Sequence, residues 1–227
     1  VFINLLGNLN FICIFVERCS ELNTLFKNMG SKERIAKEKK EIRDKILKAS
    51  LVIIIEEGCL ALSMRKIAER IEYAASTIYE YFANKDAILI TLTSNGYGML
   101  TKELQKVQRK KLQPYEELVE MWQYYWEFAF KNVELYKLMF SIQISCPKPE
   151  GEIQNINQPE ILFLKTILKN DSNLSNSSAL LNYYTMWSIV HGLISINIVT
   201  KPLDKEVNKE ILMSSINVLI NSKDAKK

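Results

Sequence analysis

Apolar side chains recur along most of this chain at the three- and four-residue spacing of amphipathic helices. The first stripe predicts a helix over residues 32–57, and Gly58 is placed to end it in the left-handed conformation. The members of this stripe are Ile35, Ile42, Ile46, Ala49 and Ile53. The pattern therefore predicts one long amphipathic helix as the first helix after residue 31.

Three more helical segments follow in quick succession. Ser63 is a suitable N-cap for a helix over 64–71, because its hydroxyl can accept a bond from a free backbone N–H of the first turn. A short break precedes a helix over 75–82, and Asn84 is placed to cap a further helix that begins at Lys85. Two short helices joined by a turn form a helix-turn-helix unit.

Beyond residue 100 the pattern remains helical. Further helices are predicted over 115–131, 134–145, 160–169, 179–200 and 205–222. Proline and glycine residues mark a loop over 147–159, and a polar run marks another over 170–178. Strand patterns are absent from the sequence. The predicted fold class is therefore all-α.

The first 28 residues differ in character from the rest. Residues 2–16 are apolar, but no basic segment precedes them and no small-x-small cleavage site follows, as a secretory signal requires. The run is also shorter than the roughly 18–20 residues that a membrane-spanning helix needs. We interpret Met29 as the true start and residues 1–28 as a dispensable or non-native extension, with a membrane-associated extension as the alternative.

The composition narrows the classes of function. A content of 48% hydrophobic and 25% charged residues is ordinary for a soluble globular protein. The four cysteines are scattered and there is one histidine, so we expect no metal site and no cofactor. The single histidine also disfavours hydrolase triads. We expect reduced cysteines, a cytoplasmic location and no stable membrane association.

The segment from Ser63 to Lys85 reads SMRKIAERIEYAASTIYEYFANK. It resembles the DNA-binding domain of the tetracycline-repressor (TetR) family, whose pattern is roughly T-x-R-x-I-A-x-x-x-G-V-S-x-x-T-L-Y-x-Y-F-x-x-K. The matching residues are Arg65, Ile67, Ala68, Thr77, Tyr79, Tyr81, Phe82 and Lys85, with Ser63 in place of Thr and Ile78 in place of Leu. The resemblance implies a three-helix domain over residues 31–92 that binds double-stranded operator DNA.

The chemistry of this segment agrees with a recognition helix. Ile78 and Phe82 stand four residues apart and supply a buried face. The hydroxyl-bearing side chains of the same helix are then offered to phosphates or bases, unless one of its tyrosines only packs. The resemblance implies that Arg65 reaches a base edge or a phosphate, and we expect Lys85 to neutralise a phosphate. The predicted DNA-binding residues are Ser63, Arg65, Ser76, Thr77, Tyr79, Tyr81 and Lys85.

Three residues depart from the family pattern. Glu72 stands where the family has a turn glycine, and a non-glycine residue with positive φ carries a cost. Ala74 replaces the serine cap of the recognition helix, which weakens that cap by about 1 kcal/mol. Glu80 places a carboxylate on the recognition helix, where it repels phosphate unless it accepts from a cytosine amine or turns away. These departures bear on operator sequence and affinity.

Residues 32–48 carry eight basic and four acidic side chains, a net charge of 8 − 4 = +4. One interpretation is a solvated helix face with pairs of opposite charge four residues apart. The other is a basic arm that contacts the DNA backbone beside the helix-turn-helix.

A second resemblance lies in the C-terminal half. Residues 185–192 read TMWSIVHG and residues 133–140 read VELYKLMF. Both resemble segments of the WHG-type regulatory domain of the TetR family, which implies a helical ligand-sensing and dimerisation domain over 93–222, followed by a tail at 223–227. A cavity lined by aromatic side chains suits a small apolar or aromatic effector. The predicted ligand-binding residues are Trp122, Tyr125, Trp126, Tyr136, Phe140, Tyr184, Trp187 and His191.

Two further features of this half have specific interpretations. His191 fits either the effector site or a core position in which it bonds to a neighbouring helix. The last helix carries a stripe that we expect to take part in a homodimer, since a palindromic operator requires a symmetric protein. The stripe consists of Val207, Ile211, Ser215 and Val218.

Together these patterns predict a sequence-specific DNA-binding transcriptional regulator, a repressor that a small apolar ligand releases from its operator. An activator or a ligand-independent DNA-binding regulator is the alternative. An enzyme that uses the aromatic C-terminal cavity is a remote third possibility.

Overall fold

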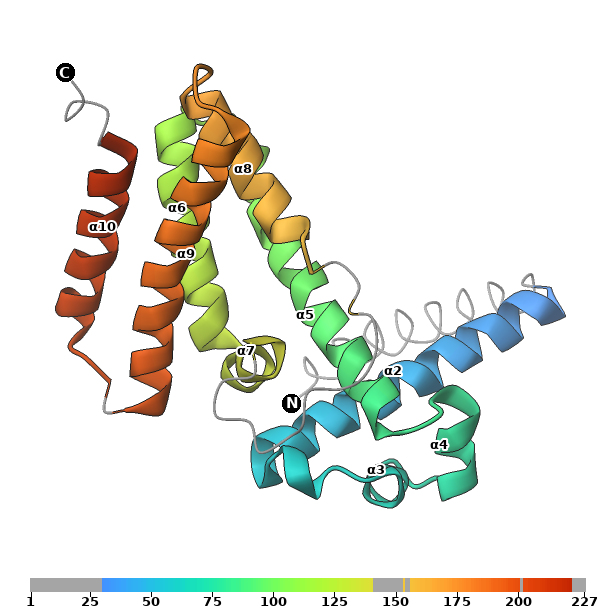
Figure 1. Ribbon diagram of the computed structural model, residues 1–227. Helices are drawn as coiled ribbons and strands as arrows, with labels where there is room; N and C mark the ends of the chain where they lie inside the picture. Colours follow the sequence, from blue (N-terminus) through green and yellow to red (C-terminus); the bar gives the residue numbers. More distant parts are fainter. Residues whose placement is uncertain (1–29, 141–152, 154–155, 201, 222–227) are drawn as a thin grey trace, which may run out of the picture. The chain divides into compact units, whose positions relative to one another are not determined.

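The computed structural model describes residues 30–140, 153, 156–200 and 202–221. Every regular element within these ranges is a helix, which confirms the all-α class (Figure 1). The chain divides into two compact units, residues 1–48 and 49–227. The interpretation of residues 1–28 falls outside the described ranges. Within them, no helix combines the length and the apolar character needed to cross a membrane.

The helices of the N-terminal half begin and end close to the predicted positions. They are α2 (Ser31–Glu57), the short 3-10 helix η1 (Cys59–Ala61), α3 (Met64–Arg70), α4 (Ala75–Tyr81) and α5 (Lys85–Gln108). Gly58, after α2, has φ 82°, the left-handed conformation predicted for it. One expectation was wrong: Cys59 is disulfide-bonded rather than reduced.

The capping residues explain why these helices start where they do. The Ser63 hydroxyl accepts a hydrogen bond from the Lys66 backbone N–H at 3.2 Å, and the Asn84 side chain accepts one from the Ala87 N–H at 2.9 Å. Both predicted caps are therefore confirmed. Ala74 makes no side-chain cap for α4, and Glu72 has φ 60°, so both expected departures are present.

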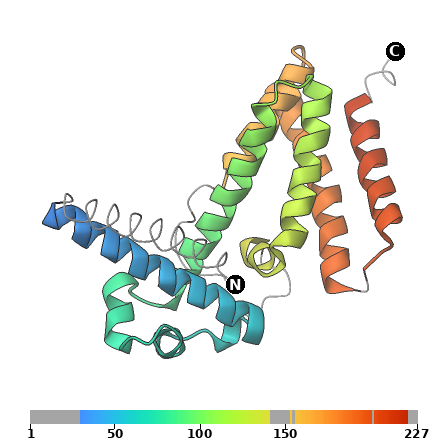
Figure 2. The ribbon, with the colours of Figure 1, turned by 180° about the vertical axis from the view of Figure 1, so that it is seen from behind.

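In its described residues, the C-terminal half has five further helices. They are α6 (Pro114–Lys131), α7 (Val133–Phe140), α8 (Gln158–Asn170), α9 (Asn176–Val199) and α10 (Lys205–Asn221). The predicted ends agree to within three residues, except that the predicted continuation of α7 to residue 145 lies outside the described ranges. Figure 2 shows α9 and α10 as antiparallel neighbours joined by a short connection.

The core of this half is apolar and rich in aromatic rings. Trp122 of α6 stacks on Phe163 of α8 with ring centroids 4.0 Å apart, and both side chains are buried. Leu100 and Leu104 of α5 are fully buried in the same cluster. The long helix α5 therefore belongs both to the helix-turn-helix and to the C-terminal core.

A buried carboxylate ties α6 to α8. Glu117 is 1% exposed and accepts hydrogen bonds from the Thr166 hydroxyl at 2.8 Å and from the Lys169 ammonium at 3.1 Å. Burial of an unpaired carboxylate is strongly unfavourable, so these two donors make the position possible. The contact specifies how the two helices align.

A pair of buried amides ties α9 to α10. Each side chain of Asn197 and Asn208 donates to the other's carbonyl oxygen, at 2.8 and 2.9 Å. The Asn197 carbonyl oxygen also accepts from the Leu203 backbone N–H at 2.9 Å, and its amide donates to the Leu193 carbonyl. Since buried polar groups must be paired, this cluster sets the geometry of the helical hairpin.

Helix α7 packs closely on α5 at Gly96, which has no side chain. A Cβ atom at Gly96 would lie 2.6 Å from Met139 Sδ, closer than side-chain atoms approach one another. The neighbouring Tyr97 hydroxyl donates to the Met139 carbonyl oxygen at 3.3 Å. Burial raises the pKa of Tyr97 to about 12, which keeps this hydroxyl a donor. The contact joins α7 directly to α5.

We expect Asn208→Ala to lower the free energy of unfolding by about 1–3 kcal/mol, because the buried Asn197 amide loses the two hydrogen bonds that it exchanges with Asn208. The free energy of unfolding is measured by urea denaturation. The exposed residue Ser214 on the same helix supplies the control variant Ser214→Ala, for which we expect little change. Equal stabilities of the two variants would contradict the structural role of the amide pair.

Candidate nucleic-acid interface and effector site

The two short helices α3 and α4 form a helix-turn-helix whose inner side is apolar. Ile67 of α3 and Ile78 of α4 are fully buried, and Phe82, directly after α4, is 3% exposed. The predicted buried face of the recognition helix is thus confirmed. Burial of Ile78 turns the rest of α4 outward, because side chains one or two positions away project from other faces of a helix.

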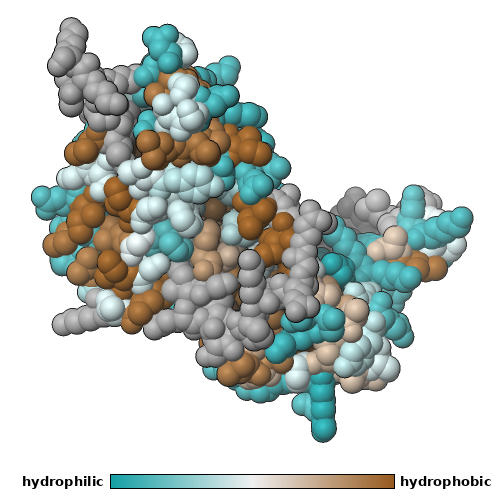
Figure 3. All heavy atoms as spheres, viewed as in Figure 1, coloured by the Kyte–Doolittle hydropathy of each residue, from teal (hydrophilic) through white to brown (hydrophobic). Residues whose placement is uncertain are grey.

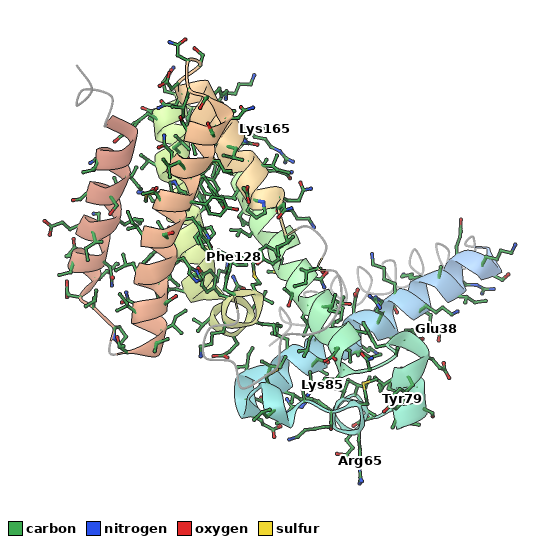
Figure 4. All side chains as sticks on the ribbon, viewed as in Figure 1. Glu38, Arg65, Tyr79, Lys85, Phe128 and Lys165 are labelled. Atoms are coloured by element: carbon green, nitrogen blue, oxygen red, sulfur yellow. The ribbon has the colours of Figure 1, made fainter. Side chains whose placement is uncertain are left out.

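The outward side presents polar groups of the kind that contact DNA. The Arg65 side chain is 87% exposed and projects away from α3, and Tyr79 of α4 is 56% exposed (Figure 4). Ser76 and Glu80 are also exposed, whereas Thr77 is half-buried. Exposure of Tyr79 argues against its being only a packing aromatic.

Ion pairs neutralise two of the basic side chains of α3. Lys66 pairs with Glu57, and Arg70 pairs with Glu56 at 2.6 Å, so both bind α3 to the end of α2. Arg65 pairs with Glu69 at 2.9 Å, but both side chains are exposed and such a pair is weak. Arg65 is therefore the basic side chain of α3 that is most exposed to solvent.

The remaining predicted DNA-binding residues occupy different settings. The Ser63 hydroxyl serves as the cap of α3, as described above. Tyr81, the last residue of α4, is half-buried, and Lys85 is half-buried at the first position of α5. Lys85 thus lies four residues after Tyr81, as in the sequence pattern of the family.

Aromatic side chains from α6, α7 and α9 meet in the C-terminal core. Phe140 of α7 lies 4.6 Å from Tyr136, 5.0 Å from His191 and 6.1 Å from Trp187, measured between ring centroids. Trp187 stacks on His191 with centroids 4.7 Å apart and an interplanar angle of 11°. We call this group, with Tyr125, the aromatic cluster.

A chain of hydrogen bonds runs through the aromatic cluster. The indole N–H of Trp187 donates to the Tyr125 hydroxyl at 2.9 Å. The Tyr125 and Tyr136 hydroxyls are 3.3 Å apart, and the Tyr136 hydroxyl lies 2.7 Å from His191 Nδ1. Three helices are therefore linked by polar contacts inside an otherwise apolar region.

The donors of this chain fix its direction. An indole nitrogen can only donate, so the Tyr125 oxygen accepts from it, and the arrangement that gives each hydroxyl proton an acceptor directs the Tyr125 proton to Tyr136. In the same arrangement the Tyr136 hydroxyl donates to Nδ1 of His191, which accepts as an unprotonated nitrogen. This arrangement is that of a neutral His191 with its proton on Nε2.

The pKa shifts agree with neutral groups throughout. Burial raises the pKa of both Tyr125 and Tyr136, so each remains a phenol that can donate. Burial lowers the pKa of His191 below its ordinary value. A protonated His191 would donate from Nδ1 and leave a hydroxyl proton of the chain without an acceptor.

The eight predicted ligand-binding residues separate into three groups. Tyr125, Tyr136, Phe140, Trp187 and His191 form the aromatic cluster. Trp122 is adjacent but 2% exposed, and Tyr184 is exposed at the edge, where its hydroxyl bonds to Glu160 at 3.2 Å. Trp126 lies elsewhere and pairs with Phe130, with ring centroids 4.7 Å apart.

Two residues of this region were missing from the predicted set. Tyr97 of α5 packs edge-to-face on Phe140 with centroids 5.7 Å apart, and Phe163 packs against Tyr125 at 6.5 Å. Each occupies an apolar position in its own helix, so periodicity alone indicates burial. Their place beside the cluster depends on how α5 and α8 pack.

Comparison with known families gives two matches along the chain. The family described as bacterial regulatory proteins, tetR family, matches residues 46–92. The domain described as tetracyclin repressor-like, C-terminal domain, matches residues 118–210. Neither match specifies the WHG subtype, which stays a prediction.

Curated relatives match the chain in part. An uncharacterized HTH-type transcriptional regulator of Haemophilus influenzae is 32% identical over 94 residues, which cover 41% of this chain and 50% of that protein. The HTH-type transcriptional repressor KstR of Mycolicibacterium smegmatis is 28% identical over 90 residues, which cover 40% and 44%. The chain thus spans half or less of the length of these relatives.

Several solved structures share the fold. A protein of Syntrophomonas wolfei described as a TetR-family regulator has a TM-score of 0.64 at 24% identity, over 80% of this chain and 96% of that one. The TetR-family repressor FadR of Thermus thermophilus, solved with lauroyl-CoA, has a TM-score of 0.57 at 17% identity, over 80% and 94%. The two family matches follow one another along a chain with this fold, and they show that it belongs to the tetR family of bacterial regulatory proteins.

Proposed function

We propose that this chain is a transcriptional repressor that binds operator DNA through α3 and α4 and leaves it when a small apolar or aromatic ligand binds the C-terminal half. The observation that carries the proposal is the helix-turn-helix itself. Its apolar side is buried at Ile78, while Arg65 and Tyr79 stay exposed on the opposite side. Membership of the family and the relative named as a repressor support it. Such a protein acts in the cytoplasm, where bacterial DNA lies.

In this proposal, some residues of the interface contact bases and others contact phosphates. Arg65 reads a base edge, because a guanidinium can bond in bidentate fashion to guanine. Tyr81 and Lys85 contact phosphates, and so do the hydroxyls of Ser76 and Thr77. Tyr79 contacts either a base or the backbone, and the basic face of residues 32–48 adds attraction to the backbone. Phosphate contacts position the protein and the base contact selects the sequence.

A homodimer is part of the proposal, because a palindromic operator needs two recognition helices related by symmetry. The face of α9 and α10 that Figure 3 shows is rich in apolar residues. Val207 and Val218 of the predicted stripe are exposed, while Leu212 and Ile216 on another side of α10 are buried in the chain's own core. The exposed apolar residues of the two helices are Leu180, Leu181, Tyr184, Ile196, Val199, Val207 and Val218.

The aromatic cluster is the proposed effector site. Its Tyr136 and Phe140 belong to α7, which packs on α5 through Met139 and Gly96. A ligand that displaces these rings must move α7, and α5 starts at the recognition helix. If the ligand binds more tightly to the displaced position of α7 than to the original one, it shifts the population toward the displaced state. In that state the two helix-turn-helix units of the dimer no longer match the spacing of the operator half-sites.

We expect Lys85→Ala and Tyr81→Ala to weaken binding to a selected operator and to random duplex DNA by similar factors. Loss of one phosphate contact lowers the slope of log K against log salt by roughly 0.9. Arg65→Ala should weaken operator binding more than random binding, by about 1–3 kcal/mol of discrimination. The measurement is fluorescence anisotropy over a salt series.

Lys165→Ala is the control for these variants, since Lys165 is exposed on α8, away from the helix-turn-helix (Figure 4). It should bind like the parent at every salt concentration. Equal losses for Arg65→Ala on operator and random DNA would contradict the division of tasks. Unchanged DNA binding in all three interface variants would contradict the proposed function.

Trp187→Ala should affect both stability and effector response. The substitution removes the donor to Tyr125 and a ring stacked on His191, so we expect a loss of up to about 3–5 kcal/mol in the free energy of unfolding. Effector-dependent release from the operator should weaken, while DNA affinity without effector stays near that of the parent. Thermal unfolding and ligand-dependent operator release are measured on the same variant. Normal release in the folded fraction would remove Trp187 from the effector site.

Acid should destabilise the protein through His191. Its pKa in the folded chain lies below the ordinary 6.5, so the unfolded chain binds more protons as the pH falls below that value. Stability is therefore fully present above about pH 6.5 and is lost as the pH falls, until it levels below the folded pKa. The chain has one histidine, so urea titrations of the parent and of His191→Gln between these limits isolate its contribution. Parallel pH curves for the two proteins would contradict the direction of the shift.

A further inference from the structure

A cavity lies between α6 and the hairpin of α9 and α10, apart from the aromatic cluster. Its volume is about 650 Å³. Sites for small organic ligands typically measure roughly 300–1,000 Å³, so the cavity is large enough for one. Its lining comes from the second half of α6, the end of α9, the connection after it and the first turns of α10. It shares no residue with the aromatic cluster.

The apolar part of this cavity is aromatic. Trp126 and Phe130 stand on successive turns of α6 with ring centroids 4.7 Å apart, and both line the cavity. Phe130 is 38% exposed and Leu203, opposite in the connection, is 39% exposed. When a ligand covers large apolar side chains that contact water, the free energy of the system falls, which favours binding. The Trp126 indole N–H has no hydrogen-bond partner within the described ranges, so it is available to an acceptor.

The polar part of the cavity has a net positive charge. Lys205 and Lys209 line it from successive turns at the start of α10, and Glu127 is the one carboxylate in its lining. None of the three forms an ion pair with another described residue. Asn197 and Asn208 also line it, but their amides bond to each other. Lys205, Lys209 and Glu127 together carry a net charge of +1, so a ligand with one negative charge would neutralise the lining.

We propose that this cavity binds a small aromatic monoanion, with its ring on Trp126 and Phe130 and its acid group between Lys205 and Lys209. The first backbone N–H groups of α10 add a favourable potential for an anion. One of them, from Glu206, bonds to the Asp204 carboxylate at 2.8 Å, so the lysines supply the principal attraction.

The position of the cavity on α10 separates this ligand from a second protein chain. At 100° per residue, Lys209 is about 180° around the helix from Val218, and Lys205 is about 160° from Val207. The exposed apolar stripe and the cavity therefore lie on different sides of α10. A dimer formed through the stripe leaves the cavity open to a small ligand.

Isothermal titration of the full chain with naphthalene-2-carboxylate tests the proposal, with naphthalene-2-carboxamide as the uncharged ligand of equal size. We expect saturable binding of the carboxylate and much weaker binding of the amide. Lys209→Glu should weaken carboxylate binding about tenfold, since it replaces one attraction by one repulsion of the exposed ion-pair class. The matched control Lys165→Glu makes the same charge change on exposed α8 and should bind like the parent.

Other variants show where the ligand binds. Trp126→Ala should weaken binding of the carboxylate, whereas Tyr136→Phe in the aromatic cluster should leave it unchanged, and thermal unfolding confirms that each variant is folded. Loss in Tyr136→Phe together with normal binding in Lys209→Glu would place the ligand in the aromatic cluster and overturn the proposal. Equal affinity for carboxylate and amide, or no saturable binding of the carboxylate, would overturn it as well. Neither result bears on DNA binding by α3 and α4.

Discussion

The C-terminal half depends on one constraint, which is that its aromatic core contains four groups that must exchange hydrogen bonds. Trp187 can only donate to Tyr125, and each hydroxyl proton has an acceptor when Tyr125 donates to Tyr136 and Tyr136 donates to His191. This series of hydrogen bonds links α6, α7 and α9, and each helix must hold its aromatic ring within hydrogen-bonding distance of the next. Apolar packing alone would allow these helices to slide against one another. The hydrogen bonds select one arrangement.

The same logic recurs at two other places in the core. Thr166 and Lys169 of α8 satisfy the buried Glu117 carboxylate, and the buried side chains of Asn197 and Asn208 exchange two hydrogen bonds. A buried polar group without partners is costly, so each of these contacts fixes a helix pair where an apolar contact would only favour it. Stability comes chiefly from the apolar and aromatic residues around them.

The link between the two ends of the molecule is α5. It begins at Lys85, directly after the recognition helix, and its later turns are buried among the helices of the C-terminal core. Gly96 allows α7 to approach it closely, and Tyr97 bonds to the α7 backbone. We propose that a displacement of α7 would reach the recognition helix through α5, since the internal hydrogen bonds of a helix resist local bending. The proposed release of DNA by a ligand rests on this continuity.

The sequence by itself determined the local features of this protein. The caps at Ser63 and Asn84, the left-handed Gly58 and the buried Ile78 follow from short-range chemistry, because backbone N–H groups near a helix start need partners close in sequence. Helix periodicity and the motif from residue 63 to 85 were enough to predict the helix-turn-helix.

Only the tertiary structure decided which distant residues meet. Tyr125 and Trp126 are neighbours in the sequence, yet Tyr125 is buried in the aromatic cluster and Trp126 lines the cavity beside α10, because neighbouring positions on a helix point about 100° apart. The bond between Tyr136 and His191 spans 55 residues, and no local pattern records it. Such contacts depend on the angles at which whole helices pack, and these angles result from the shapes of all the buried side chains together.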